Sequence, residues 1–224
     1  MKVLLVSDME CPALWEHFQP SRVEGIDLIV SCGDLKKDYL EFLVTMGNKP
    51  LFYIPGNHDS GYRTRPPEGC ECIDDRVVEY QGIRILGLGG CKRYSLNEPY
   101  QYSEEEMRKR IQKLRREIRK MGGVDMIVTH AAITGYGDAP DNAHRGFDCF
   151  LDLVQEYHPT YFCHGHVHRS YGWDIPRSLE CGSTTVINAF ERYTLEIDED
   201  RVRAMRESTS PAHRFRIMDR LFHG

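Results

Sequence analysis

The sequence predicts an α/β fold, in which strands alternate with helices along the chain. The pattern is clearest in residues 2–56, where three short apolar runs are separated by two stretches with helical signals. The runs are almost continuously apolar, as in strands that are buried on both faces. A chain of 224 residues can bury the core of one such domain. Strands connected in this way form a parallel sheet with right-handed crossovers.

The expected elements follow in chain order. The strands cover residues 2–8, 26–33, 50–56, 76–81, 83–90, 125–130, 161–166, 184–190 and 192–198. The helices cover residues 36–47, 103–121 and 146–157, and Pro12 opens a shorter one. Two segments, 60–74 and 91–102, show no periodicity and are expected to be loops.

Local signals justify the bounds of these elements. Pro55-Gly56 marks a sharp exit from the third strand, and Gln81-Gly82 separates two runs that are typical of a hairpin. Residues 36–47 and 146–157 each have an apolar face at helical spacing. The helix at 103–121 opens with a capping box, Ser103-Glu104-Glu105-Glu106.

The helix at 103–121 has two features that each allow two interpretations. Its apolar positions are spaced by four and three residues, and they are Met107, Ile111, Leu114, Ile118 and Met121. Such a stripe packs on its own core or joins two copies, so a homo-oligomer is open. The basic residues of the same helix form either a solvated face paired with glutamates or a contact for an acidic partner.

Composition and charge narrow the function. The net charge of −5 makes nucleic acid an unlikely partner. No apolar run approaches the ~20 residues of a membrane helix, and the N-terminal run is too short for a signal peptide. Eight cysteines without a signal indicate reduced thiols and favour a cytoplasmic protein. We expect one domain over residues 1–200 and a basic tail over 201–224, which either docks or frays.

Potential metal ligands follow five of the expected strands at the point where each ends. Asp8, Asp34 and His130 close three of them, and Asn57-His58 follows a fourth. The fifth runs into Cys163-His164-Gly165-His166-Val167-His168, where a strand would send all three histidines to one face. Carboxylates, amides and imidazoles bind divalent metal ions, so these strand ends predict a metal site.

The calcineurin-like metallophosphoesterases carry a series of motifs that this sequence resembles in the same order. The matching segments are Asp8, Gly33-Asp34, Gly56-Asn57-His58-Asp59, Thr129-His130 and Gly165-His166-Val167-His168. The resemblance spans residues 2–198. It implies a sandwich of two mixed β-sheets flanked by helices. It also implies hydrolysis of phosphate esters by a hydroxide held between two divalent metal ions.

The resemblance assigns metal ligands to this sequence. Asp34 would bridge the two ions, because cations held roughly 3.5–4 Å apart repel each other unless a carboxylate lies between them. The other ligands would be Asp8 and His168 at the first ion, and Asn57, His130 and His166 at the second. His58 would contact the phosphate and assist the leaving oxygen, and Asp59 would orient the His58 ring by a hydrogen bond.

The sequence departs from the family pattern at one ligand position. Asp8-Met9-Glu10 stands where the family has Asp-x-His. Glu10 either ligates, directly or through water, or points away and leaves the first ion weakly held. We expect ligation. The additional carboxylate would favour Mn²⁺ or Fe²⁺ over Zn²⁺, with Mg²⁺ also open.

The most favoured function is a metal-dependent phosphodiesterase that acts on small molecules, with phosphomonoesters also open. Asp138, His144 and Arg145 lie in the loop after His130, which borders the substrate cleft in related small phosphoesterases, and are candidates for substrate binding. A nuclease on the same fold is disfavoured by the net charge. A non-catalytic interaction scaffold is the third alternative, although only one expected ligand is altered here.

Overall fold

The described part of the fold consists of two large β-sheets, a small two-stranded sheet, and the helices that cover the large sheets. A computed structural model describes residues 1–96, 98–170 and 175–209. The strands are β1 (Lys2–Ser7), β2 (Leu28–Ser31), β3 (Leu51–Tyr53), β4 (Glu71–Cys72), β5 (Arg76–Tyr80), β6 (Ile83–Leu88), β7 (Cys91–Lys92), β8 (Gln101–Tyr102), β9 (Met126–Thr129), β10 (Tyr161–His164), β11 (Ser178–Cys181), β12 (Thr184–Asn188) and β13 (Glu191–Glu196). The helices are α1 (Lys37–Gly47), α2 (Glu104–Lys120), α3 (Asp148–Tyr157) and α4 (Glu199–Thr209), with 3₁₀ turns η1 (Pro12–Leu14), η2 (Pro20–Arg22) and η3 (Ser60–Arg63).

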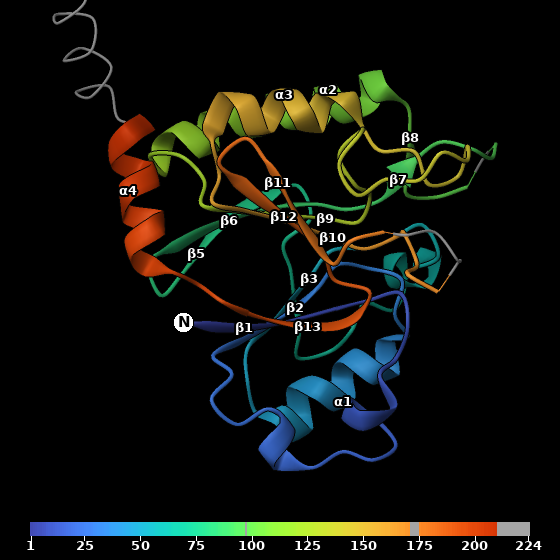
Figure 1. Ribbon diagram of the computed structural model, residues 1–224. Coiled ribbons are helices and arrows are strands. Elements are labelled where there is room, and N and C mark those ends of the chain that lie inside the picture. Colours follow the sequence, from blue (N-terminus) through green and yellow to red (C-terminus); the bar gives the residue numbers. More distant parts are fainter. Residues whose placement is uncertain (97, 171–174, 210–224) are drawn as a thin grey trace, which may run out of the picture.

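The two large sheets are mixed, and this confirms the predicted fold class. One has the order β13-β1-β2-β3-β4, with only β13 antiparallel to its neighbour. The other has the order β11-β12-β10-β9-β6-β5, with antiparallel strands at both edges. They pack face to face, with α1 outside the first sheet and α2 and α3 outside the second (Figure 1). The strands predicted at residues 184–190 and 192–198 correspond to β12 and β13, and they belong to different sheets.

Strand β1 shows why the apolar runs are continuous. Val3 and Leu5 pack between the two sheets, whereas Leu4 and Val6 pack against the side that α1 covers. Both faces of the strand are therefore buried, so every position along it favours an apolar residue.

Helix α2 resolves the two interpretations of its sequence. The capping box is formed between Ser103 and Glu106. The stripe from Met107 to Ile118 packs in the core of its own chain. Four of its basic residues pair with acidic groups of the same chain: Arg108 with Asp152, Lys109 with Glu105, Arg110 with Asp74, and Arg115 with Glu156. The stripe is thus a core face, and these side chains are largely engaged within the chain.

Helix α4 was not expected from the sequence. Val202 is the one buried residue of this helix, so its sequence shows no clear apolar periodicity. Val202 joins the core between the sheets, and Arg206 donates to the buried carboxylate of Asp125. Residues 201–209 of the segment expected to form a tail thus belong to this helix, and residues 210–224 lie outside the described part of the chain.

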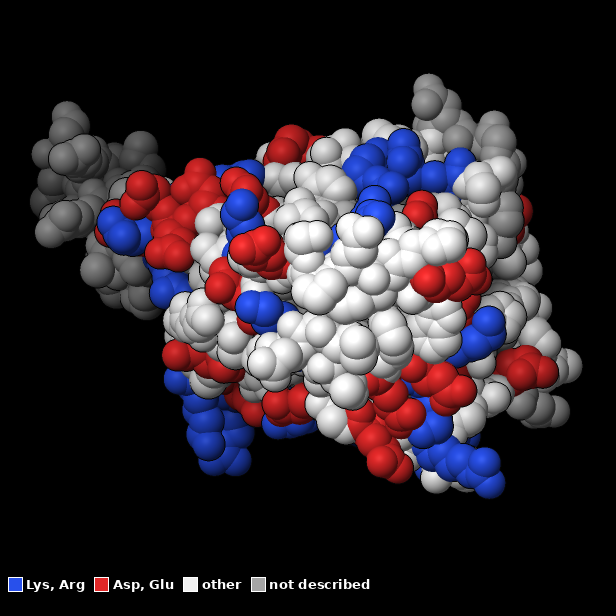
Figure 2. Space-filling model, turned by 90° about the horizontal axis from the view of Figure 1, so that it is seen from below, with Lys and Arg blue, Asp and Glu red and all other residues white. Residues whose placement is uncertain are grey.

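The surface on the side of α1 has an uncharged centre (Figure 2). Lys and Arg side chains lie in several separate places around it, interspersed with Asp and Glu. This face therefore lacks, over its described residues, the continuous basic area that nucleic-acid binding uses. All eight cysteines are free thiols. None of the described helices has the length and hydropathy that crossing a membrane requires.

Candidate metal centre

The predicted ligands lie together at one edge of the sandwich. Asp8 follows β1, Asp34 follows β2, Asn57 follows β3, and His130 follows β9. Strands β1, β2 and β3 are parallel to one another, and β9 is parallel to β6 and β10. Their carboxyl ends meet at the same edge, where open α/β sheets usually bind ligands. Ligand atoms of Asp34, His130 and His166 all lie within 4.8 Å of one another.

His130 shows that this cluster needs a cation. It is fully buried, and its Nδ1 lies 2.8 Å from the carbonyl oxygen of Cys32, which can only accept a hydrogen bond. The hydrogen of a neutral ring therefore sits on Nδ1. Its Nε2 faces two more acceptors, Asp34 Oδ2 at 3.2 Å and Asn57 Oδ1 at 3.0 Å. Either a proton on Nε2 or a metal ion must lie among these three atoms, so the donor set fits a bound divalent cation.

Without metal, a proton serves as that cation. Burial lowers the pKa of His130, but the charge of Asp34 and the hydrogen bond to it outweigh burial and raise this pKa to about 9. Burial also raises the pKa of Asp34, but His130 and the backbone N–H of His58 outweigh it and lower this pKa to about 2. The metal-free site is therefore an ion pair between imidazolium and carboxylate.

His166 has the hydrogen-bonding and charge state that a neutral metal ligand requires. Its Nε2 lies 2.8 Å from the carbonyl oxygen of Ala143, to which it donates, so Nδ1 has a free lone pair. Burial lowers the pKa of His166 to about 3, which keeps the ring uncharged. The prediction of a histidine strand face was wrong in one respect: β10 ends at His164, and His166 has a φ of 66°. Its backbone N–H donates to both carboxylate oxygens of Asp8, at 2.9 and 3.0 Å, and this fixes the turn.

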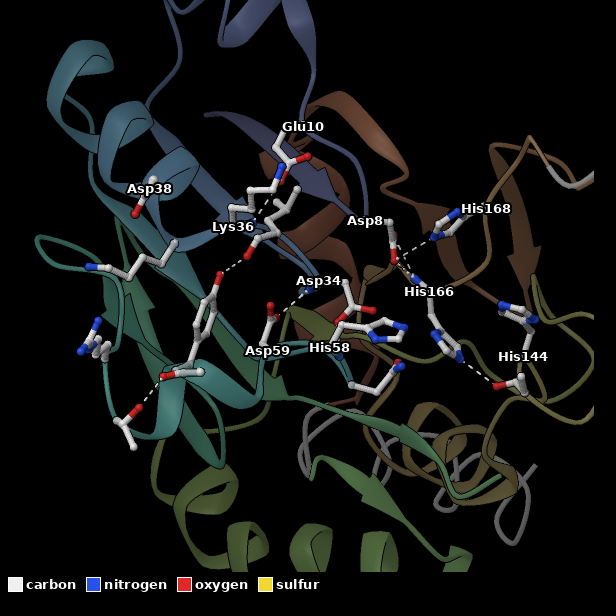
Figure 3. A pocket seen from close by; sticks show the side chains of 18 of the residues that line it. Asp8, Glu10, Asp34, Lys36, Asp38, His58, Asp59, His144, His166 and His168 are labelled. Carbon is white, nitrogen blue, oxygen red and sulfur yellow. Dashed lines mark hydrogen bonds and ion pairs between the residues drawn. The ribbon is translucent and has the colours of Figure 1, made fainter. Parts of the chain in front are cut away.

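The ligands expected at the first ion are less closely grouped. The side chain of Asp8 is buried, and its Oδ1 lies 3.7 Å from Nε2 of His168, whose ring packs on Phe190. Glu10 lies apart from both, beside Lys36 (Figure 3). Its Oε1 accepts from the Lys36 backbone N–H at 3.2 Å and lies 3.6 Å from Lys36 Nζ.

Two motif glycines let the carboxylates approach the backbone. A Cβ on Gly56 would collide with the carboxylate of Asp34. A Cβ on Gly165 would collide with the Ser7 hydroxyl and approach the carboxylate of Asp8. Asp8 and Asp34 themselves have φ values of 65° and 57°, which aspartate tolerates better than most residues. These glycines therefore serve the geometry of the site.

Asp59 has a different role from the one expected. Its Oδ2 accepts from the backbone N–H groups of Gly56 at 2.7 Å and of Asp34 at 2.8 Å. Among the described residues, no hydrogen bond joins its carboxylate to the His58 ring. Asp59 thus joins the two loops that carry Asp34 and Asn57, and does not orient His58.

A cavity of about 1030 Å³ opens beside the cluster. His58, Glu10 and His144 line it, and His144 is held by Asp141 at 2.9 Å. The other two candidates for substrate binding lie elsewhere. Asp138 accepts from the backbone N–H groups of Gly135 and Gly146 and stabilises its own loop. Arg145 is exposed and outside the cavity lining.

Sequence reasoning missed Tyr94, which also lines the cavity. Its hydroxyl accepts from Asn57 Nδ2 at 3.1 Å, and this turns Asn57 Oδ1 toward His130. Tyr94 lies in an expected loop without periodicity, so no local signal marks it. Only the contact across 37 positions of the chain reveals its role.

Comparisons with known proteins agree with this geometry. The model of the calcineurin-like phosphoesterase family matches residues 1–170. "Uncharacterized protein MJ1162" of Methanocaldococcus jannaschii is 22% identical over 199 residues, which cover 84% of this chain and 87% of that protein. The solved structure of TT1561 of Thermus thermophilus is 12% identical, with a TM-score of 0.55 and coverage of 85% of this chain and 89% of its own.

A further solved structure, 14% identical, has a TM-score of 0.64 and covers 87% of this chain and 94% of its own. At these identities the two structures show a shared fold. The family match covers most of the chain, and the ligand cluster described above lies within it. The chain therefore belongs to the calcineurin-like phosphoesterase family, whose members are metal-dependent hydrolases of phosphate esters.

Proposed function

We propose that this protein is a phosphodiesterase that acts on small molecules with two divalent cations. The observation that supports this best is the placement of the ligand cluster against a cavity of about 1030 Å³. This volume lies at the upper end of the range for sites that hold drug-sized ligands. It leaves room for a substituent on each side of a phosphate that lies at the cluster.

The donor atoms divide into two sets that share Asp34. Asn57, His130 and His166 would hold one cation, and Asp8, His168 and Glu10 the other. Glu10 stays in this set because its contacts with Lys36 use Oε1 alone, which leaves Oε2 for a cation or its water. The added carboxylate favours Mn²⁺ or Fe²⁺. When bound, such cations neutralise phosphate charge and lower the pKa of water toward 7.

The protein's own groups bind the ester and move the proton. The backbone N–H of His58 donates to Asp34 Oδ1 at 2.8 Å, and this holds the exposed His58 ring at the cavity wall. We assign His58 as the group that protonates the leaving oxygen. Asp59 keeps the loop of His58 in register with Asp34 through its two backbone contacts.

The test is a comparison of bis-p-nitrophenyl phosphate with p-nitrophenyl phosphate at saturating Mn²⁺. We expect kcat/KM for the diester to exceed that for the monoester by at least about tenfold, a difference of about 1.4 kcal/mol. Turnover should stop with a chelator and return with Mn²⁺. A preference for the monoester, or turnover that persists with the chelator, would contradict the proposal. Metal binding without any turnover would favour the scaffold alternative.

A further inference from the structure

The cavity continues from the metal centre to a second wall. This distal wall consists of Lys36, Lys37, Asp38, Tyr62, Thr64 and Arg65. It combines the start of α1 with the η3 turn, which opens the loop at residues 60–74. Lys36 and Asp38 lie on the side of the cavity away from His166 and His144 (Figure 3). The loop that carries no periodic signal in the sequence therefore forms part of the binding cavity.

The distal wall is held in place before any ligand binds. The Tyr62 hydroxyl donates to the carbonyl oxygen of Leu35, which ties the η3 turn to the start of α1. The Tyr62 ring also packs edge-on against Tyr53, with centroids 5.5 Å apart. The Thr64 hydroxyl donates to the carbonyl oxygen of Gly61 at 3.2 Å. The two segments are thus fixed relative to each other.

Two of the three cations on the distal wall are available to a ligand. Lys37 is engaged by Glu41, with 2.5 Å between Nζ and Oε1. Lys36 is 77% exposed, and its Nζ forms an ion pair with Glu10 Oε1 at 3.6 Å that is longer than a hydrogen bond. Arg65 is exposed, and in the described ranges of the chain no ion pair involves it. Lys36 and Arg65 can therefore turn toward an anionic group in the cavity.

Asp38 is the acidic side chain on the same wall. It lies in the first turn of α1, where the N-terminal end of the helix dipole stabilises a carboxylate and offsets part of its charge. Asp38 and Glu10 therefore weaken the positive potential of the wall, and Glu10 does so mainly at Lys36, with which it is ion-paired. Arg65 is the stronger of the two candidates, because a guanidinium forms two parallel hydrogen bonds with a phosphate.

We propose that the distal wall binds a second phosphate group of the substrate through Arg65 and Lys36, while the phosphodiester to be cleaved lies at the metal centre. The substrate class is then a phosphodiester that carries an additional phosphomonoester, such as a nucleotide ester phosphorylated on its sugar. This inference rests on the proposed phosphodiesterase function and specifies its substrate.

Two matched chromogenic diesters test the proposal. Thymidine 5′-(p-nitrophenyl phosphate) and its 3′-phosphorylated form release the same leaving group and differ only in the second phosphate. We expect wild-type protein with Mn²⁺ to show about tenfold higher kcat/KM for the 3′-phosphorylated ester, as one charge-assisted contact provides. Arg65→Ala should bring the ratio of the two kcat/KM values close to one, and Lys36→Ala should lower it several-fold.

Arg63→Ala is the control. Arg63 belongs to the same η3 turn but lies over the ring of Tyr100, 5.0 Å from its centroid, and is not part of the distal wall. This variant should keep the wild-type ratio. Equal kcat/KM values for the two esters in wild-type protein, or an unchanged ratio in Arg65→Ala, would overturn this inference and leave the phosphodiesterase function standing. Failure to hydrolyse either ester with Mn²⁺ would overturn both.

Discussion

Replacing Asp34 with asparagine is expected to lower kcat/KM for phosphodiester hydrolysis by at least about a thousandfold. Asp34 Oδ2 faces His130 at 3.2 Å, and Oδ1 accepts from the His58 N–H at 2.8 Å, and the proposed function makes this carboxylate the ligand shared by both cations. An uncharged amide would not offset the repulsion of the two adjacent cations that the proposed function requires. The loss of about 4 kcal/mol of metal-ion stabilisation in the transition state corresponds to about a thousandfold in rate.

A matched substitution controls for the change from carboxylate to amide. Asp200 is 89% exposed on α4, and Asp200→Asn should retain wild-type activity. Circular dichroism would show that both variants are folded, and metal content would show which of them has lost cations. If Asp34→Asn retained more than about a tenth of the wild-type kcat/KM, the bridging role of this carboxylate would be wrong.

Asp59→Ala is expected to lower the free energy of unfolding by about 2–5 kcal/mol. The substitution removes the shared acceptor of the Gly56 and Asp34 N–H groups, and an unsatisfied buried donor costs about 1–3 kcal/mol. For a chain of this size the melting temperature should fall by about 2–4 °C per kcal/mol. Asp59→Asn keeps one oxygen that can accept both bonds, so it should lose less. Urea denaturation of both variants measures the difference, and equal losses would contradict the assigned role.

The stability contributed by Asp59 should also depend on pH. Burial and then the charge of Asp34 raise the pKa of Asp59 from 3.8 to about 7. The pKa of Asp59 is higher in the folded state than in the unfolded state. Its contribution to the free energy of unfolding is therefore complete below about pH 3.8 and is lost as the pH rises through about 7. Asp59→Asn has no such group, so its stability relative to wild type should improve between pH 4 and 7. A constant difference over this interval would show that the carboxyl does not titrate there.

The sequence predicted the placement of those candidate ligands that a local pattern marks. Asp8, Asp34 and His130 end continuous apolar runs, and burial on both strand faces makes such runs visible without knowledge of the tertiary fold. The position of the edge where the ligands meet follows from the parallel strand order. The fold class was predictable for the same reason.

The parts that depend on contacts between distant loops could not be predicted. The turn at His166 is fixed by Asp8, 158 positions away, so the alternation of histidines wrongly indicated a continuing strand. Asp59 stands next to His58 in sequence, yet it binds the backbone of Asp34. Arg65 joins the cavity only because η3 packs against the start of α1.

The central proposal is that two cations bind and share Asp34. Calorimetric titration of Mn²⁺ into metal-free protein at pH 7 tests it most directly. We expect two ions per chain, and the release of a proton from His130, whose pKa is raised to about 9 by Asp34 against the effect of burial. Repeating the titration in buffers of different ionisation enthalpy measures that proton, and Asp34→Asn should not bind both ions. Saturation at a single ion, with no proton released, would contradict the two-cation centre.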